Sequence, residues 1–309
     1  SLLVGVFAAA IQRGIWSHRR GAHADLRGAV CSKVHGPHGS GATGSGSGVG
    51  HAGVDPARSE FNEAVAAATG SEELLRLCAK HLPELDAFPV DKALRRLAKL
   101  GYTRGLERDS RFQALARAVA ARASTWEPGC LAYTTWAVAK LRVRKEDLLG
   151  PLSAASVARI HELQTSELTT MVWSFARLAL GAAPHLHAIG EAVRALVGEF
   201  SLRELANVSW AFATLAFDDR PLVETLASAS TALCSAFPPE STQNLSNSVW
   251  AIAKLRVVHE PLLVVVSAAS IPRIPEFTTQ GLSNTLWAYA AVCFESAPLV
   301  RSISSAAAA

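Results

Sequence analysis

LANVSWAFATL (Leu205–Leu215), LSNSVWAIAKL (Leu245–Leu255) and LSNTLWAYAAV (Leu282–Val292) are three versions of one sequence pattern. The tryptophan inside it recurs along the chain at intervals of 37, 37, 40 and 37 residues. The five copies are Trp136, Trp173, Trp210, Trp250 and Trp287. Five of the seven tryptophans therefore follow one period, and a period of this length is typical of two-helix repeats.

Large and small apolar residues alternate around each tryptophan. A leucine stands five positions before it, alanine or serine follows it directly, and alanine stands three positions after it. These positions share one broad face of an α-helix, so the pattern predicts a first helix in every repeat. Because such a helix packs on neighbours, we expect the tryptophans and alanines to form the core between repeats rather than to stack on bases.

Proline and hydroxyl residues mark the ends of the predicted helices. Proline is tolerated in the first turn of a helix, and hydroxyl side chains cap helix N-termini, so each repeat is predicted to be helix, short loop, helix. A proline follows the tryptophan after eleven positions in four repeats, at Pro184, Pro221, Pro261 and Pro298. A hydroxyl residue precedes the tryptophan by nine positions in three repeats, at Ser201, Ser241 and Thr278.

The pattern predicts an all-α protein, an α-solenoid of stacked two-helix repeats of about 37 residues. Residues 126–309 are predicted to hold five repeats, the last of them truncated. Residues 56–125 are predicted to hold degenerate N-terminal repeats, since Ala93–Leu100 (ALRRLAKL) resembles a first helix that lacks the tryptophan.

Residues 1–55 differ in composition from the rest of the chain. An apolar run too short to span a membrane is followed by arginines with almost no acidic residues, as in an organellar transit peptide. Residues 36–53 are rich in Gly and Ser and are predicted to form a flexible linker. The alternative is that the whole of residues 1–55 is a disordered tail without a targeting role.

The net charge of +4 is unevenly distributed over the 309 residues. From residue 129 onward there are 13 Lys and Arg against 14 Asp and Glu, which leaves 17 basic and 12 acidic residues before that point. The repeats are therefore close to neutral. This weakens the case for nucleic-acid binding, because neutralisation of phosphates usually dominates such affinity.

No catalytic or metal-binding motif is visible in the sequence. It lacks a GxxxxGK[ST] loop, an HExxH helix and a CxxC pair, so we expect no enzyme, no metal and no cofactor. The five cysteines are widely spaced, and three of them, Cys130, Cys234 and Cys293, lie in apolar helical sequence where we expect them to be buried.

The tryptophan-centred pattern resembles the octotricopeptide repeat proteins and the related helical arrays of FAST kinase-like and RAP-domain proteins. The resemblance covers about residues 60–309, with five repeats that match well. It implies a protein of a mitochondrion, slightly favoured, or of a plastid. Such a protein would bind single-stranded organellar mRNA or rRNA and act in RNA processing, stability, translation or ribosome assembly. No RAP domain is visible, which puts nuclease activity in doubt.

A polar stripe recurs beside the tryptophan. The positions seven before, three before and four after it share one face of the helix, because seven residues advance a helix by almost two turns. We define the stripe by the residues at these positions that are candidates for RNA binding. They are Lys140, Ser166, Thr170, Arg177, Arg203, Asn207, Gln243, Asn247, Lys254, Gln280 and Asn284.

Two functions remain open for the stripe. In the first, amides contact bases and cations contact phosphates of RNA, within a ribonucleoprotein or ribosomal assembly and without a membrane. In the second, the chain is an armadillo-like protein–protein interaction scaffold, whose recurring asparagines grip an extended peptide. A third reading is structural: Asn207, Asn247 and Asn284 bond backbone groups of the adjacent repeat.

Overall fold

The structure is a computed structural model that describes residues 56–81, 87–101, 105–236 and 241–308. All of them belong to one unit, His51–Ala309. The predicted transit peptide and linker in residues 1–55 lie outside the described residues. Within the described ranges every regular element is a helix and no strand is present, so the all-α prediction is confirmed.

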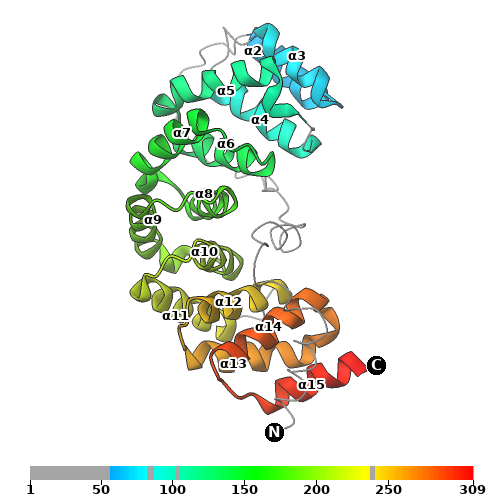
Figure 1. The fold of residues 1–309 in the computed structure, drawn as a ribbon, viewed down its shortest axis with the longest axis vertical. Coiled ribbons are helices and arrows are strands. Elements are labelled where there is room, and N and C mark those ends of the chain that lie inside the picture. The colour runs from blue at the N-terminus through cyan, green and yellow to red at the C-terminus, as the bar shows by residue number, and fades with distance from the viewer. Residues whose placement is uncertain (1–55, 82–86, 102–104, 237–240, 309) are drawn as a thin grey trace. The chain divides into compact units, whose positions relative to one another are not determined.

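The helices alternate along the chain between first and second members of a pair (Figure 1). The first helices are α2 (Pro56–Ala67), α4 (Ala87–Leu100), α6 (Pro128–Lys140), α8 (Thr165–Leu178), α10 (Leu202–Thr214), α12 (Thr242–Lys254) and α14 (Thr279–Ala291). The second helices are α3 (Ser71–His81), α5 (Ser110–Arg122), α7 (Glu146–Ala158), α9 (Ala183–Ala195), α11 (Arg220–Ala236), α13 (Glu260–Ser270) and α15 (Ala297–Ala308).

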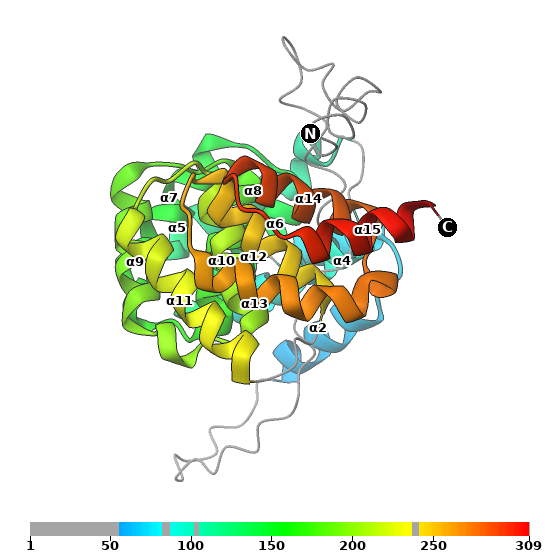
Figure 2. The same cartoon turned by 90° about the horizontal axis from the view of Figure 1, so that it is seen from below.

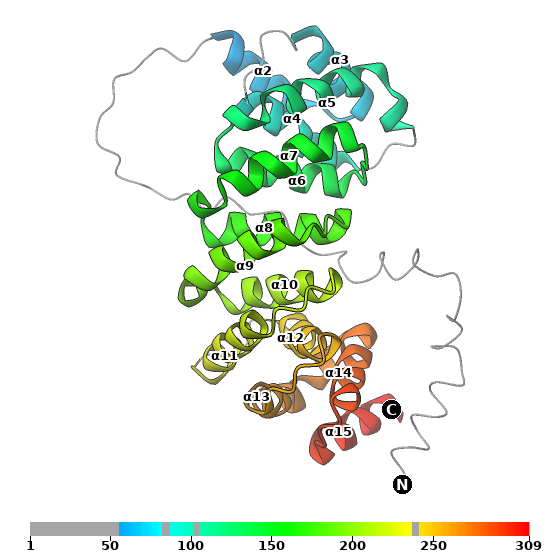
Figure 3. The same cartoon turned by 60° about the vertical axis from the view of Figure 1, so that its left-hand side comes forward.

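Each first helix packs against the first helices before and after it, and the second helices form a second layer (Figure 1). Figure 2 shows the same two layers from below, and Figure 3 shows the pairs following one another along the chain. The first helices pack against one another more closely than the second helices do. This stacking of pairs in two layers is the α-solenoid that the tryptophan period predicts.

The predicted helix starts are confirmed. The Oγ atoms of Ser201 and Ser241 accept hydrogen bonds from the backbone N–H groups of Glu204 and Gln243, at 3.3 and 3.2 Å. The Oγ1 atom of Thr278 accepts one from the N–H group of Gly281 at 3.0 Å. The four recurrent prolines all lie in the first turn of a second helix, where their missing N–H leaves no hydrogen bond unmade.

The tryptophans are not equally buried. Trp136 and Trp173 are buried, as predicted for core residues, whereas Trp210 and Trp250 are half-buried. Trp287, on the last first helix, is 43% exposed, and its ring centroid lies 6.5 Å from that of Trp250. The apolar core lies chiefly between the two layers, with the indoles at the edge of the first-helix layer.

Every tryptophan-containing first helix ends in the same way. The sixth residue after the tryptophan has a positive φ of 52–59°, although none of these residues is glycine. The next residue donates its N–H to the carbonyl five positions back, for example Phe217 to Phe212 at 3.1 Å, which defines a Schellman motif. The left-handed residues are Arg142, Ala179, Ala216, Arg256 and Cys293.

Glycine at such a position is expected to stabilise the chain. We expect Ala216→Gly to raise the free energy of unfolding by about 1 kcal/mol, because a side chain at positive φ clashes with its own backbone. Chemical denaturation measures this difference. The matched control is Gly101→Ala at the end of α4, where φ is 100°, and it should lower stability by a similar amount. A loss of stability in Ala216→Gly would contradict the assignment.

The cysteine prediction is partly wrong. Cys234 is buried and Cys130 is half-buried, but Cys293 is exposed, because it lies two positions beyond the end of α14, in the left-handed turn. A helix long and apolar enough to cross a bilayer does not occur in the described ranges.

Candidate nucleic-acid interface

Most of the stripe residues lie at the surface of the first helices α6 to α14. The helices α6 to α12 also pack against the first helices before and after them and against their own second helices. On α10, Arg203 and Thr214 are exposed, and Asn207 and Trp210 between them are half-buried. The predicted positions therefore form one continuous face along the helix.

Ten of the eleven stripe residues are accessible on this face. The exposed members are Ser166, Arg203, Gln243, Lys254 and Gln280. The half-buried members are Lys140, Thr170, Arg177, Asn207 and Asn284. The first helices α4 to α14 follow one another in a single layer (Figure 1). Since the accessible residues recur on α6 to α14, we infer that they form a row across the repeats.

Asn247 is the exception, and its inclusion in an accessible surface was wrong. Its side chain is only 5% exposed. The reason is that α12 packs especially closely against both α10 and α14, which also buries Ser246 and Ser248 on the same helix. Asn247 therefore belongs to the packing between repeats rather than to the surface.

Three stripe side chains, those of Gln280, Asn284 and Thr170, make hydrogen bonds within their own helices. The Nε2 atom of Gln280 donates to the Oδ1 atom of Asn284 at 2.8 Å. The Oγ1 atom of Thr170 donates to the backbone carbonyl of Ser166, also at 2.8 Å. These contacts orient the polar groups along the helix and bring none of them onto the backbone of the adjacent repeat.

Cations lie over aromatic rings at the N-terminal end of the row. The Lys140 Nζ atom lies 6.0 Å from the Trp136 ring centroid, and the Arg177 Cζ atom lies 5.6 Å from that of Trp173. In each pair the cation comes four positions after the aromatic residue, so one turn of helix sets the geometry. In both pairs the positive charge lies close to an aromatic ring of the same helix.

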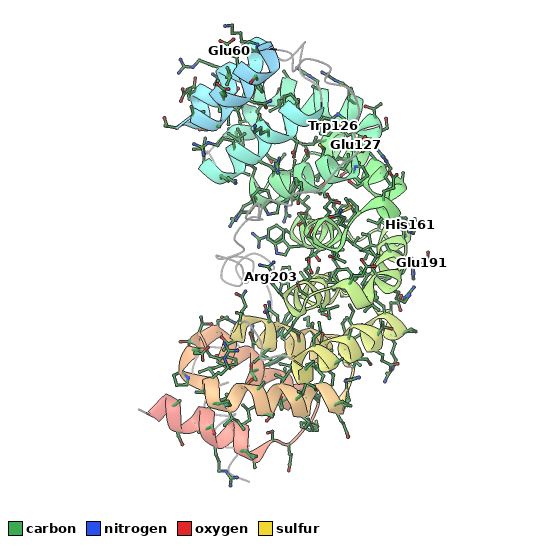
Figure 4. The ribbon with its side chains drawn as sticks, turned by 180° about the vertical axis from the view of Figure 1, so that it is seen from behind. Glu60, Trp126, Glu127, His161, Glu191 and Arg203 are labelled. Carbon is green, nitrogen blue, oxygen red and sulfur yellow. The ribbon has the colours of Figure 1, made fainter. Side chains whose placement is uncertain are left out.

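The first and second helices of the repeats differ in the charged residues that they carry. The first helices α6 to α14 contain four Lys or Arg and two acidic residues, whereas the second helices α7 to α15 contain three Arg and five acidic residues. Both first-helix acids, Glu167 and Glu204, accept hydrogen bonds from backbone N–H groups at the helix start. Figure 4 shows Arg203 on the opposite side of the two layers from Glu191.

A charged cluster lies at the contact between α4 and α6. Asp91 is 1% exposed, and its Oδ2 atom is 2.9 Å from the Nη2 atom of Arg95. Its Oδ1 atom accepts a hydrogen bond from Thr134 Oγ1 at 3.3 Å. The Arg95 Cζ atom lies 4.9 Å from the ring centroid of Tyr133, which stands three positions before Trp136.

Burial controls ionisation in this cluster. It raises the pKa of Asp91 to about 7, although Arg95 and the Thr134 hydroxyl oppose the shift. Burial also raises the pKa of Cys130 to about 11 and moves the pKa of Tyr133 upward, in both cases with help from nearby carboxylates. The cluster therefore holds a carboxyl group that titrates near neutrality beside a permanent cation.

Sequence reasoning missed Arg95 and Asp91. Aligning Ala98–Lys99–Leu100 with Ala139–Lys140–Leu141 places Arg95 at the position of the tryptophan, 41 residues before Trp136. The resemblance of α4 to a first helix contained this signal, but the missing indole concealed it. Within the described residues no group of three or more His, Cys, Asp or Glu is arranged to hold a metal ion.

Comparison with known proteins supplies one family. The family model described as RNA-editing substrate-binding complex 6 protein matches residues 87–307, which is most of the chain. The match begins at α4 and runs through α15, so it includes the whole stripe. No curated protein matches the chain.

Proposed function

The chain belongs to the RNA-editing substrate-binding complex 6 protein family, and from this premise we propose that its first-helix face binds single-stranded RNA. The role is binding without catalysis. The family name links its members to RNA and to a complex, and the stripe supplies a surface suited to such a ligand. The octotricopeptide resemblance supports the same role through a different set of motifs.

The observation that carries the proposal is the separation of charge between the layers. A neutral chain binds RNA when its cations lie on one face and its acids on another, because the phosphates respond to the local charge. Four cations extend along the first-helix face from α6 to α12, and its two acids are occupied at helix starts. The five acidic residues of the second helices belong to the other layer.

The amide and hydroxyl groups of the stripe give the proposal its specificity. Unpaired bases present hydrogen-bonding edges that amides can contact, and helical-repeat proteins use two or three side chains per base for this purpose. Residues that vary between repeats, Arg203, Gln243 and Gln280, are suited to distinguish bases. The recurring asparagines are suited to uniform contacts, since Asn207 and Asn284 are accessible on their helices.

We also propose an organellar setting, mitochondrial in preference to plastid, with a ribonucleoprotein or ribosomal assembly as partner. The support is the arginine-rich, acid-poor composition of residues 1–34 and the octotricopeptide resemblance. Import assays with fluorescent fusions of the full-length protein test this setting. A fusion that stays outside organelles would refute it.

RNA binding is tested by removing the positive charges of the first-helix face. Replacing Lys140, Arg177, Arg203 and Lys254 together by glutamine should weaken binding to a mixed-sequence single-stranded RNA by about 10- to 100-fold. The slope of log K against log salt should become shallower by about 0.7 for each phosphate that the variant no longer neutralises. Fluorescence anisotropy across a salt series measures both quantities.

The matched control removes cations from the other layer. Arg220→Gln with Arg301→Gln changes two second-helix residues, both exposed, and should leave affinity and salt slope unchanged. Equal reductions of affinity in both variants would show non-specific attraction instead of a defined face. Salt-insensitive capture of a protein partner, without RNA binding, would favour the armadillo-like scaffold.

A further inference from the structure

We propose that Arg95 and Tyr133 together form a stacking site for one nucleobase of the bound RNA. The inference rests on the proposed function and names the ligand of one position on that face. The site lies at the contact between α4 and α6. The position that holds a tryptophan on α6 and the later first helices holds Arg95 on α4.

The register of the repeats identifies the site. On α12 the indole lies at the contact with the next first helix, since the ring centroids of Trp250 and Trp287 are 6.5 Å apart. On α4 the position of the indole holds Arg95, and the position four before it holds Asp91. The planar guanidinium of Arg95 therefore occupies the position of the indole in the later helices. The carboxyl group of Asp91 occupies the position that Ala132 has on α6.

The geometry fixes the guanidinium of Arg95 and leaves part of the side chain exposed. Asp91 is buried and fixes the Nη2 atom of Arg95 at 2.9 Å, while Thr134 fixes the carboxylate in turn. The Arg95 Cζ atom lies 4.9 Å from the Tyr133 centroid. The Arg95 side chain is 30% exposed, although its Nε atom is buried.

Tyr133 places this pair beside the stripe, at one of the helical positions from which the stripe is built. It stands three positions before the tryptophan of α6, where the later first helices carry Thr170, Asn207, Asn247 and Asn284. Among the five tryptophan-containing helices, α6 alone has an aromatic residue at this position. Bases stack on aromatic rings and on guanidinium planes, so Tyr133 and Arg95 offer one composite surface for a base.

The surrounding charge favours a base over a phosphate. Asp91, Glu127 and Glu167 all act electrostatically on Cys130, next to the one cation Arg95. Glu167 lies close over α6, since a Cβ atom added to Gly129 would be 2.6 Å from its Oε1 atom. The carboxylates of Glu127 and Glu167 near the N-terminal end of α6 repel a phosphate, whereas a neutral base is not repelled and gains from stacking.

The experiment compares two probes of equal length and charge. One is a single-stranded RNA oligonucleotide, and the other is the corresponding ribose-phosphate chain without bases. The unmodified protein should prefer the first, because bases add stacking to a shared electrostatic attraction. Tyr133→Leu should reduce this preference by about 10-fold, the contribution of one stacked base.

Further variants separate stacking from a structural role. Tyr133→Phe keeps the ring and should retain the full preference. Arg95→Lys keeps the charge but lacks the plane, and should lower the preference as Tyr133→Leu does. Circular dichroism checks that each variant is folded. The salt slope should be unchanged in all three, since none of them removes a positive charge.

The outcomes distinguish this site from the function on which it rests. RNA binding that depends on the stripe cations, with the same base preference in Tyr133→Leu and in the unmodified protein, would overturn the stacking site alone. A reduced salt slope in Tyr133→Leu would point to phosphate binding and would also overturn it. Failure of the unmodified protein to bind either probe would remove both proposals.

Discussion

Replacing Phe212 by alanine is expected to lower the free energy of unfolding by about 3–5 kcal/mol. Phe212 is completely buried on α10 and contacts Phe217, with ring centroids 5.5 Å apart. Removal of the ring leaves a cavity between the two helical layers, because helices that are packed against neighbours on several sides cannot close the space.

The position of Phe212 makes this effect larger than its volume alone suggests. The Phe212 carbonyl accepts a hydrogen bond from the N–H group of Phe217 in the turn that ends α10. The two residues are therefore joined by a backbone bond of the Schellman motif as well as by the contact between their rings. The equivalent pair is Tyr289 on α14 and Phe294 in the turn after it, and their ring centroids lie 5.9 Å apart. In a stacked array each repeat also stabilises its neighbours, so the substitution weakens two interfaces.

Denaturation monitored by tryptophan fluorescence measures the effect of Phe212→Ala. The control on the same helix is Thr214→Ala, whose exposed side chain should change stability by less than about 0.5 kcal/mol. A decrease below about 1 kcal/mol in Phe212→Ala would contradict the packing described for α10.

The repeat architecture could be predicted from sequence because each helical pair carries its own local signals. Tryptophan spacing, the hydroxyl caps such as Ser201 and the prolines such as Pro221 depend on positions within one repeat. Such short-range patterns are set by helix geometry and the chemistry of helix ends. The stripe was found for the same reason, since three positions of one helix decide which face is polar.

Features that depend on packing between repeats were not predictable. The burial of Asn247 arises from the close approach of α10 and α14 to α12, which no local period encodes. The left-handed turns escaped notice because Ala216 and Arg256 carry none of the signal that glycine would give. Arg95 was missed because it is chemically unlike the indole, although it occupies the same place.

The second large effect concerns pH and the buried carboxyl group of Asp91. Its pKa rises from an ordinary value near 3.8 to about 7 in the folded chain, chiefly because burial penalises the charged form. Between these values the folded chain keeps a proton that the unfolded chain has released. The free energy of unfolding therefore falls as pH rises through this window, by up to about 4 kcal/mol in total.

Carboxyl groups elsewhere oppose this trend. The Arg111 guanidinium beside Asp109 lowers the pKa of that carboxyl to about 2, so its contribution to stability is present at neutral pH and disappears on acidification. Total stability thus combines effects of opposite sign. The contribution of Asp91 is isolated by the difference between the unmodified protein and Asp91→Asn, measured by denaturation at several pH values.

Asp91→Asn is expected to be more stable than the unmodified protein at pH 8 and to lose this advantage as the pH falls to about 4. The reason is that asparagine resembles the protonated carboxyl, which is the favoured form in the buried position, while its Oδ1 atom still accepts from Thr134. Arg95 tolerates the change because its side chain is 30% exposed and retains water. Asp109→Asn should show the opposite dependence, with a decrease in stability at neutral pH that disappears in acid. A difference curve for Asp91→Asn that stays flat from pH 4 to 8 would show that water reaches the carboxylate and that burial does not control its charge.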